Sequence, residues 1–257
     1  MKVGSKEIKV IHETLEEVGE FLRKDFRNKK SNHDYQKSDV KSSADRRAEE
    51  IIVEKLKENF PEHGILSEES GEILGAEYQW IVDPLDGTNN FVCSIPYYST
   101  CLALVDSNQN CIFSAINIPE TRQIFTARSE EGAFMNKEKL DVSKQQSLSR
   151  GTVSFVIGHD VKADSEDLKK SRQIEEAIAS NSKRVLNTWC PSIDWTLVSR
   201  GEIEALFCYK PDNEEFFSGY NLAEEAGCYL YESEYCVIAS QDKEIVEELK
   251  DKTEHLI

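Results

Sequence analysis

Two aspartates that follow an apolar run have the residue types and spacing to hold a metal ion. The segment Asp83-Pro84-Leu85-Asp86-Gly87-Thr88 comes directly after Trp80-Ile81-Val82, which predicts a strand ending at the first carboxylate. Pro84 favours a turn and Gly87 permits tight backbone geometry, so both carboxylates and a backbone carbonyl can point into one crevice. Oxygen ligands at short spacing suit Mg²⁺. The alternative is an ordinary Asx-type turn leading out of a strand.

The residues around this segment favour phosphate chemistry. If a helical turn begins near Gly87 and Thr88, their backbone N–H groups can hold a phosphate oxygen. Upstream, Glu68-Glu69 follows the short apolar run Gly64-Ile65-Leu66. A third carboxylate there would complete a site for more than one cation, and two metals can stabilise the attacking and leaving oxygens in phosphoryl transfer. The alternative for the Glu pair is a solvated surface loop.

These motifs are similar to those of one enzyme family. The chain resembles the inositol monophosphatase superfamily of Mg²⁺-dependent, lithium-sensitive phosphatases. The family's Glu-Glu motif looks like Glu68-Glu69, and its D-P-[I/L]-D-G-T-x-N-F motif is matched at every fixed position by residues 83–91. The resemblance covers most of the chain and is strongest from about Asp39 to Leu104.

The resemblance implies a role for each matched residue. The metal ligands would be carboxylates and one carbonyl, namely Glu68, Asp83, Asp86 and the Leu85 carbonyl. Thr88 would orient and activate the attacking water with help from Asp45, and Asp39 matches the acidic start of the same motif. Glu68 is also expected to act in catalysis. Phosphate and substrate would contact Asp86, Gly87 and Thr88.

The family's second motif is altered in this chain. The pattern W-D-x-A-A-G, followed by a helix ending E-A-G, is similar to residues 214–219 and then Glu224-Glu225-Ala226-Gly227. Glu214 stands at the Trp position, and Glu215 stands where the family has the Asp that binds metal and a substrate hydroxyl. Glu215 is still expected to bind both, although its extra methylene changes the geometry that Mg²⁺ demands. The alternative is a helix-start acid favoured by the helix dipole.

Positions on the substrate side are also altered. The family's Gly-[Ser/Thr]-Ala segment looks like Trp189-Cys190-Pro191, and an acid that contacts inositol hydroxyls aligns with Cys208. The Trp189 ring is expected in the core, with stacking on a sugar or base as the alternative. Asn90-Phe91 is typical of the inositol phosphatases in the superfamily. The sequences Leu66-Ser67-Glu68-Glu69 and Asp83-Pro84-Leu85-Asp86 also suit a bisphosphate nucleotidase.

The pattern of apolar residues predicts alternating helices and strands, an α/β fold. Helices are expected at 6–26, 43–59, 164–180, 193–200, 215–227 and 242–252. Strands are expected at 65–66, 79–82, 99–105, 111–117, 123–127, 153–157, 205–209 and 236–239, and a loop at 28–38. The resemblance implies a layered α-β-α-β-α sandwich, one phosphatase domain over residues 1–257 with lobes of about 1–150 and 151–257, commonly assembled as a homodimer.

Charge and cysteine usage limit the partners and the compartment. Among 257 residues the net charge is −17, which argues against nucleic acid polymers and anionic membranes but not against a small phosphorylated metabolite. Seven scattered cysteines without metal-ligand spacing predict reduced thiols. The first residues lack the apolar core of a signal peptide, and no apolar run approaches a membrane span. A cytoplasmic protein is therefore expected.

The predicted function is Mg²⁺-dependent hydrolysis of a small phosphate monoester by metal-activated water, with inositol monophosphate as the first candidate substrate. Two alternatives share this chemistry, namely a 3′(2′),5′-bisphosphate nucleotidase and a fructose-1,6-bisphosphatase-type enzyme. An alternative of another class is a catalytically impaired regulatory or binding homologue, which the changes at Glu215 and Cys208 motivate.

Overall fold

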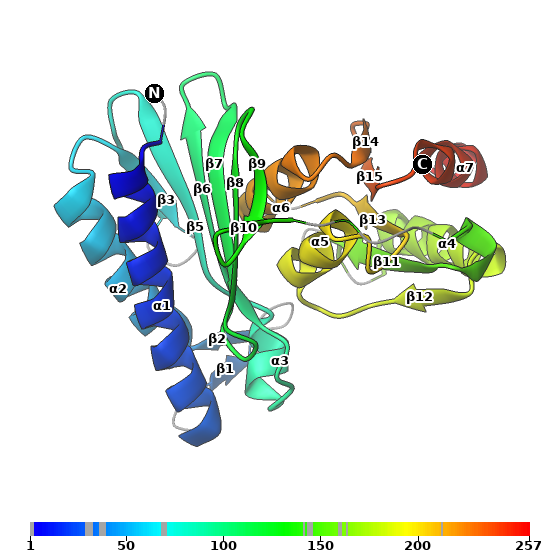
Figure 1. The fold of residues 1–257 in the computed structure, drawn as a ribbon. Helices are drawn as coiled ribbons and strands as arrows, with labels where there is room; N and C mark the ends of the chain where they lie inside the picture. The colour runs from blue at the N-terminus through cyan, green and yellow to red at the C-terminus, as the bar shows by residue number, and fades with distance from the viewer. Residues whose placement is uncertain are drawn as a thin grey trace.

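The computed structural model describes residues 3–28, 33–35, 40–67, 71–140, 142, 146–158, 161–162, 164–211 and 213–257. At 33–35, 40–41 and 213–215 only the backbone is described. Figure 1 shows that the helices and sheets lie in alternating layers along the longest dimension of the molecule.

The first layer is a pair of amphipathic helices, α1 (Ser5–Asn28) and α2 (Ser43–Asn59). The apolar stripe of α1 that includes Ile11, Leu15 and Val18 is buried in one cluster with residues of α2 and of the first sheet. Ser42 caps α2, and its side chain and that of Asp45 form a capping box. The short strands β1 (His33–Tyr35) and β2 (Val40–Ser42) pair in the segment between the two helices, so the predicted loop at 28–38 contains a strand.

The second layer is an eight-stranded sheet in the order β10-β9-β8-β7-β6-β5-β3-β4. Its strands are β3 (Gly64–Ser67), β4 (Gly71–Ile73), β5 (Tyr78–Asp86), β6 (Ser99–Asp106), β7 (Cys111–Ile118), β8 (Gln123–Arg128), β9 (Gly132–Met135) and β10 (Glu138–Lys139). The one parallel pair is β3 with β5, and its register places Ser67 beside Val82. The end of β3 therefore lies one residue from Asp83.

The third layer separates two sheets. It consists of α5 (Pro191–Ser199) and α6 (Asn213–Glu225). Cys190, Ile193 and Leu222 pack on the eight-stranded sheet, while Trp195, Val198 and Ala223 pack with residues of the second sheet. Apolar residues therefore cover both faces of this helical layer.

The remaining layers complete the sandwich. The second sheet has the order β12-β11-β13-β15-β14, and its strands are β11 (Thr152–Ile157), β12 (Arg184–Leu186), β13 (Ala205–Tyr209), β14 (Tyr229–Glu232) and β15 (Cys236–Ser240). The helices α4 (Glu166–Asn181) and α7 (Lys243–Thr253) cover its outer face. Short helices α3 (Thr88–Val92), η1 (Leu148–Arg150) and η2 (Glu254–Leu256) complete the described elements. The α-β-α-β-α sandwich expected from the sequence is confirmed.

Other expectations have mixed outcomes. All seven cysteines are free thiols, as expected for reduced residues. No helix within the described residues has the length and apolar character to span a bilayer. The one-domain interpretation with lobes meeting near residue 150 stays a prediction.

Candidate active site

The carboxyl end of β5 carries both aspartates of the predicted metal site. Asp83 and Asp86 are 5% and 8% exposed. Residues three apart would lie on opposite faces of a regular strand, but the pairing of β5 with β6 shifts register between Asp83 and Asp86. Burial, followed by the charges of Asp83 and Asp86, raises the pKa of the Cys101 thiol well above its usual value. Both carboxylates therefore act on one neighbouring thiol, which lies on β6 opposite Asp83.

The face of the sheet that presents Asp83 follows from its neighbours on β5. Trp80 and Val82 pack in the cluster that contains α1 and α2. Ile81 packs with Phe217 of α6 in a separate cluster. Because side chains alternate along a strand, Asp83 belongs to the face that α6 covers. The carboxylate thus lies toward the central helical layer.

The turn after Asp83 is fixed by its own side chains. The Leu85 N–H donates to Asp83 Oδ1 at 3.0 Å, an Asx-type turn. Gly87 has φ 83° and precedes α3, and a Cβ there would lie 2.9 Å from the Tyr97 carbonyl oxygen. A side chain at Gly87 would therefore meet both backbone strain and a clash. The helical turn expected at Thr88 is present as α3.

Thr88 and Asp45, which are 43 residues apart, lie in contact. Thr88 Oγ1 is 3.0 Å from Asp45 Oδ1 and 2.8 Å from the Leu85 carbonyl oxygen. A hydroxyl has one proton, so Thr88 donates to one of these acceptors at a time. The other Asp45 oxygen, Oδ2, accepts from the Ser42 N–H at 3.0 Å. Burial raises the Asp45 pKa to about 6, although its hydrogen bonds to Ser42 and Thr88 lower it.

Asp86 is held by the amino-terminal end of α5, more than 100 residues away in sequence. Its Oδ2 accepts from the Ser192 N–H at 2.8 Å, from the Ser192 hydroxyl, and from the Cys190 thiol at 3.2 Å. Burial and the Asp86 charge raise the Cys190 pKa well above its usual value, so this thiol remains a neutral donor. The sequence indicated Cys190 only as an altered substrate-side residue and did not indicate Ser192. Pro191 at the first position of α5 was the available signal for a helix start there.

Asp194, a buried acid of α5, holds the segment before this helix. Thr188 Oγ1 donates to Asp194 Oδ2 at 2.7 Å. Burial raises the Asp194 pKa to about 7, and the charge of Asp86 contributes to the same shift. Asn90 of α3 donates to the Thr188 carbonyl at 2.8 Å. Asp194 was not singled out in the sequence because one acid in an apolar helix carries no motif.

Several predicted site residues cannot be placed. Glu68 and Asp39 lie outside the described residues, and Glu215 belongs to the first turn of α6 with its side chain undescribed. Within the described part of the chain, no three Asp, Glu, His or Cys side chains gather in a way that could hold a metal. The donors that are described nevertheless suit Mg²⁺, since two carboxylates and the Leu85 carbonyl supply only oxygen. Their roles as ligands stay predictions.

Two substrate-side positions can be placed. Cys208 is buried on β13, in the cluster of the second sheet that packs against α5 and α6. Trp189 is 68% exposed, so the expectation of a core aromatic is wrong. Its backbone φ is 59°, a conformation that is uncommon for a bulky residue.

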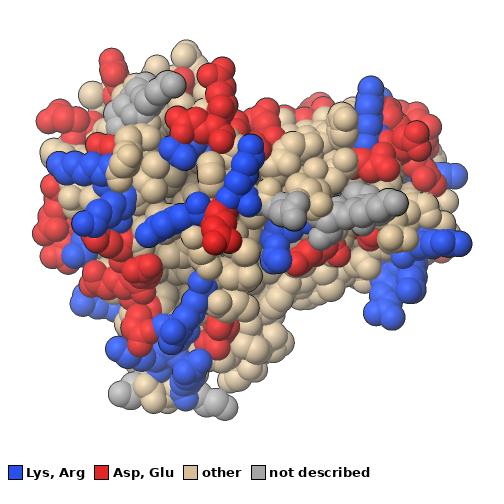
Figure 2. All heavy atoms as spheres, in the orientation of Figure 1, with Lys and Arg blue, Asp and Glu red and all other residues tan. Residues whose placement is uncertain are grey.

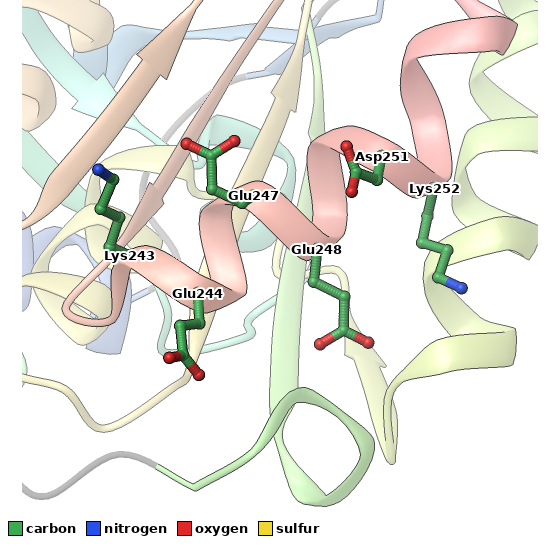
Figure 3. A pocket seen from close by; sticks show the side chains of 6 residues that line it. All are labelled: Lys243, Glu244, Glu247, Glu248, Asp251 and Lys252. Atoms are coloured by element: carbon green, nitrogen blue, oxygen red, sulfur yellow. The ribbon is translucent and has the colours of Figure 1, made fainter.

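One surface hollow within the described residues is lined by charged side chains that do not converge. Figure 3 shows it along α7, where Glu244 and Glu248 point from one side of the helix and Glu247 and Asp251 from the other. These acids diverge and lie at the opposite end of the molecule from α1 (Figure 1). The buried side chains that converge on one turn are those at the end of β5.

Comparison with known proteins identifies the family of this chain. The model of the inositol monophosphatase family matches residues 5–257. The chain therefore belongs to the inositol monophosphatase family, a family of phosphatase-type enzymes. It is 27% identical to an inositol monophosphatase of Dictyostelium discoideum over 206 residues, covering 78% of this chain and 72% of that protein. It is 28% identical to the Nus factor SuhB of Xylella fastidiosa over 225 residues, or 87% and 80% of the two chains.

Solved structures share the fold. The extragenic suppressor protein SuhB of Bartonella henselae superposes with a TM-score of 0.89 at 24% identity, covering 98% of this chain and all of that one. An IMPase/NADP phosphatase solved with NADP and Ca²⁺ superposes with a TM-score of 0.80 at 19% identity, covering 96% and 94% of the two chains. At these identities the likeness concerns the fold alone.

Proposed function

We propose that this protein is a Mg²⁺-dependent phosphatase that hydrolyses a small phosphate monoester, with inositol monophosphate as the first candidate substrate. The observation that carries the proposal is the 3.0 Å contact between Thr88 and Asp45, made beside the turn that bears Asp83 and Asp86. A hydroxyl bonded to a buried carboxylate of raised pKa is suited to accept a proton from water.

The metal would be held by Asp83, Asp86 and the Leu85 carbonyl, together with Glu68 and Glu215. When bound, Mg²⁺ would supply positive charge that neutralises the phosphate and favours deprotonation of water. As a metal ligand, Asp86 would have a fixed orientation, because Ser192 and Cys190 donate hydrogen bonds to one of its oxygens. The chain thus presents its carboxylate without the entropy cost of ordering a free side chain.

The proton of the attacking water has a route through this chain's residues. The Thr88 oxygen accepts a proton from water as the Thr88 hydroxyl proton passes to Asp45 Oδ1. The water oxygen forms a bond to phosphorus, and the ester P–O bond breaks on the opposite side. The leaving alkoxide is protonated from solvent. No covalent enzyme intermediate is required.

Asn90 and Phe91, which the sequence associates with inositol phosphatases, make contacts within the fold. The Asn90 amide donates to the carbonyls of Tyr97 and Thr188, and the Phe91 ring packs 4.9 Å from that of Tyr98. Both side chains are buried and structural in this chain. Because these contacts are internal, adenosine 3′,5′-bisphosphate and fructose 1,6-bisphosphate belong in the same panel as inositol 1-phosphate.

The test is phosphate release from this panel in Mg²⁺, repeated with Li⁺ added and with Mg²⁺ removed. We expect release that requires Mg²⁺ and falls with Li⁺. Metal binding without release from any ester would favour the regulatory or binding homologue. Sedimentation of the same sample tests the expected homodimer.

Asp86→Asn is the sharpest variant for this proposal. The amide keeps an oxygen acceptor for Ser192 but loses the negative charge that would bind Mg²⁺, so we expect Mg²⁺-dependent turnover to fall by at least about 100-fold. Thermal unfolding of the variant should stay cooperative. Asp251→Asn, on the exposed face of α7, is the matched control (Figure 3). Near-normal turnover of Asp86→Asn would refute the assignment.

A further inference from the structure

Trp189 is the tryptophan of this chain that packing does not explain. Trp80 and Trp195 are buried in core clusters, whereas Trp189 is 68% exposed. No aromatic contact to the Trp189 ring is found among the described rings. A large apolar side chain left in solvent gives the fold little hydrophobic stabilisation.

The backbone at Trp189 also disfavours a bulky residue. Its φ of 59° lies in the left-handed region, where glycine is favoured and a side chain with a Cβ costs energy. Neither side-chain burial nor backbone conformation therefore accounts for a tryptophan here. Residues held against such preferences cluster where a ligand binds.

The residues on either side of Trp189 hold its backbone beside the turn that bears Asp83 and Asp86. The Thr188 carbonyl accepts from Asn90 of α3 at 2.8 Å. On the other side, the Cys190 thiol lies 3.2 Å from Asp86 Oδ2. Consecutive Cα atoms are about 3.8 Å apart, so the Trp189 backbone is confined to the rim of this turn. Its side chain is 68% exposed.

The surface next to this rim suits a ring that stacks. Figure 2 shows few Lys, Arg, Asp or Glu side chains on the visible face over α3 and below α5. Indole stacks on aromatic bases and packs on the C–H face of saturated rings, and base–aromatic stacking is worth about 1–3 kcal/mol.

We propose that Trp189 is a stacking platform that selects phosphate monoesters whose leaving group carries a flat ring face. The proposal rests on the phosphatase function above and names its class of substrate. It distinguishes ring-bearing esters from acyclic ones such as glycerol phosphate. A nucleoside base and a cyclitol ring offer the same kind of contact, so adenosine 5′-monophosphate and inositol 1-phosphate test the two sources.

The kinetic test compares Trp189→Gly and Trp189→Phe with the wild type. Glycine fits the backbone and removes the ring, so we expect an unchanged or higher melting temperature. The ratio of kcat/KM for the preferred ring-bearing ester to that for glycerol phosphate should fall about tenfold, mostly through KM. Phenylalanine should restore most of the ratio. An equal loss on every ester, or no change in the ratio, would overturn the proposal, as would a change in sedimentation that explains the kinetic loss.

A matched control separates strain relief from ring removal. Gln109 also has positive φ, 65°, and lies exposed in the turn between β6 and β7. That turn follows Asp106, at the opposite end of β6 from Ser99, which pairs with Asp86. Gln109→Gly should leave the ratio unchanged for every ester.

Fluorescence tests the platform without turnover. Because the other two tryptophans are buried, ligand-dependent emission of the wild-type protein in Mg²⁺ should report on Trp189. We expect a ring-bearing ester to change the emission and glycerol phosphate to leave it unchanged, and Trp189→Gly to lose the response. A response without any phosphate release would retain this inference while the proposed function fails. Phosphate release without any response would overturn this inference alone.

Discussion

At the scale of single residues, Asp45 is a buried carboxyl group whose pKa is raised by burial and lowered by its hydrogen bonds. It caps the start of α2 through Ser42 and accepts from Thr88. Both tasks keep the carboxyl buried, and burial raises its pKa to about 6. An acid of this pKa is partly protonated near pH 6, which suits a group that receives a proton and returns it to solvent.

The raised pKa of Asp45 predicts a pH dependence of stability. The Asp45 pKa is raised from 3.8 to about 6 on folding, so between these values the folded state binds more protons than the unfolded state. The Asp45 contribution to the free energy of unfolding should therefore fall by up to about 3 kcal/mol as pH rises from 4 to 6 in metal-free buffer.

Urea titrations over this pH range check the prediction by comparing wild type with Asp45→Asn. The comparison concerns the slope against pH and not the absolute stability, because asparagine also changes the capping bonds. The slope of stability against pH should be more negative in the wild type than in the variant. Parallel curves for the two proteins would contradict a raised pKa at Asp45.

At the scale of elements, the amino-terminal end of α5 completes a site that β5 begins. Ser192 and Cys190 donate to Asp86, and Thr188 bonds to Asn90 of α3. These contacts join segments about 100 residues apart, so no local pattern indicated them. What the sequence did show is that Pro191 suits a helix start.

Loss of the Ser192 hydroxyl should make the orientation of the Asp86 carboxylate less fixed. Groups that orient a metal ligand typically contribute 10- to 100-fold to metal affinity, so Ser192→Ala should raise the Mg²⁺ concentration for half-maximal activity about tenfold. Ser199→Ala is the control, because this buried serine of the same helix donates to the Trp195 carbonyl instead. Equal Mg²⁺ dependence in the two variants would show that Asp86 needs no support from α5.

At the scale of the whole molecule, the central helices join the two sheets. Gly219 of α6 packs so closely on α5 that a Cβ would lie 2.2 Å from the Trp195 ring. Trp195 belongs to the cluster that packs on the second sheet, while Leu222 of α6 packs on the first. A change at this contact should therefore destabilise the packing on both sheets.

Gly219→Ala should destabilise the whole protein by about 1–3 kcal/mol through overpacking. Calorimetry should show one transition with a melting temperature lowered by several degrees. Glu224→Ala, at an exposed position of the same helix, should change stability by less than about 0.5 kcal/mol. Two separate transitions, with one unaffected by Gly219→Ala, would contradict coupling through the central layer.

Periodicity in the sequence determined most elements of this fold. The helix at 43–59 and the strand at 205–209 have the predicted bounds, because their apolar stripes and flanking residues are local signals. The short strands β1, β2, β4, β9, β10, β12 and β14 were not predicted. Strands of two to four residues carry too little periodicity to be recognised, and their side chains gain stability mainly from packing on a paired neighbour.

The sequence by itself determined the chemistry of the proposed site, because the carboxylates, the glycine and the threonine of one turn lie together in the chain and need only a strand before them. The tertiary structure alone decided what surrounds that turn. It brought Asp45 to Thr88 and Ser192 to Asp86, and it left Trp189 in solvent where the sequence favoured burial. The physical reason is the distance along the sequence over which each feature is determined. The chemistry of a turn depends on adjacent residues, whereas burial and contacts between layers depend on how distant segments pack.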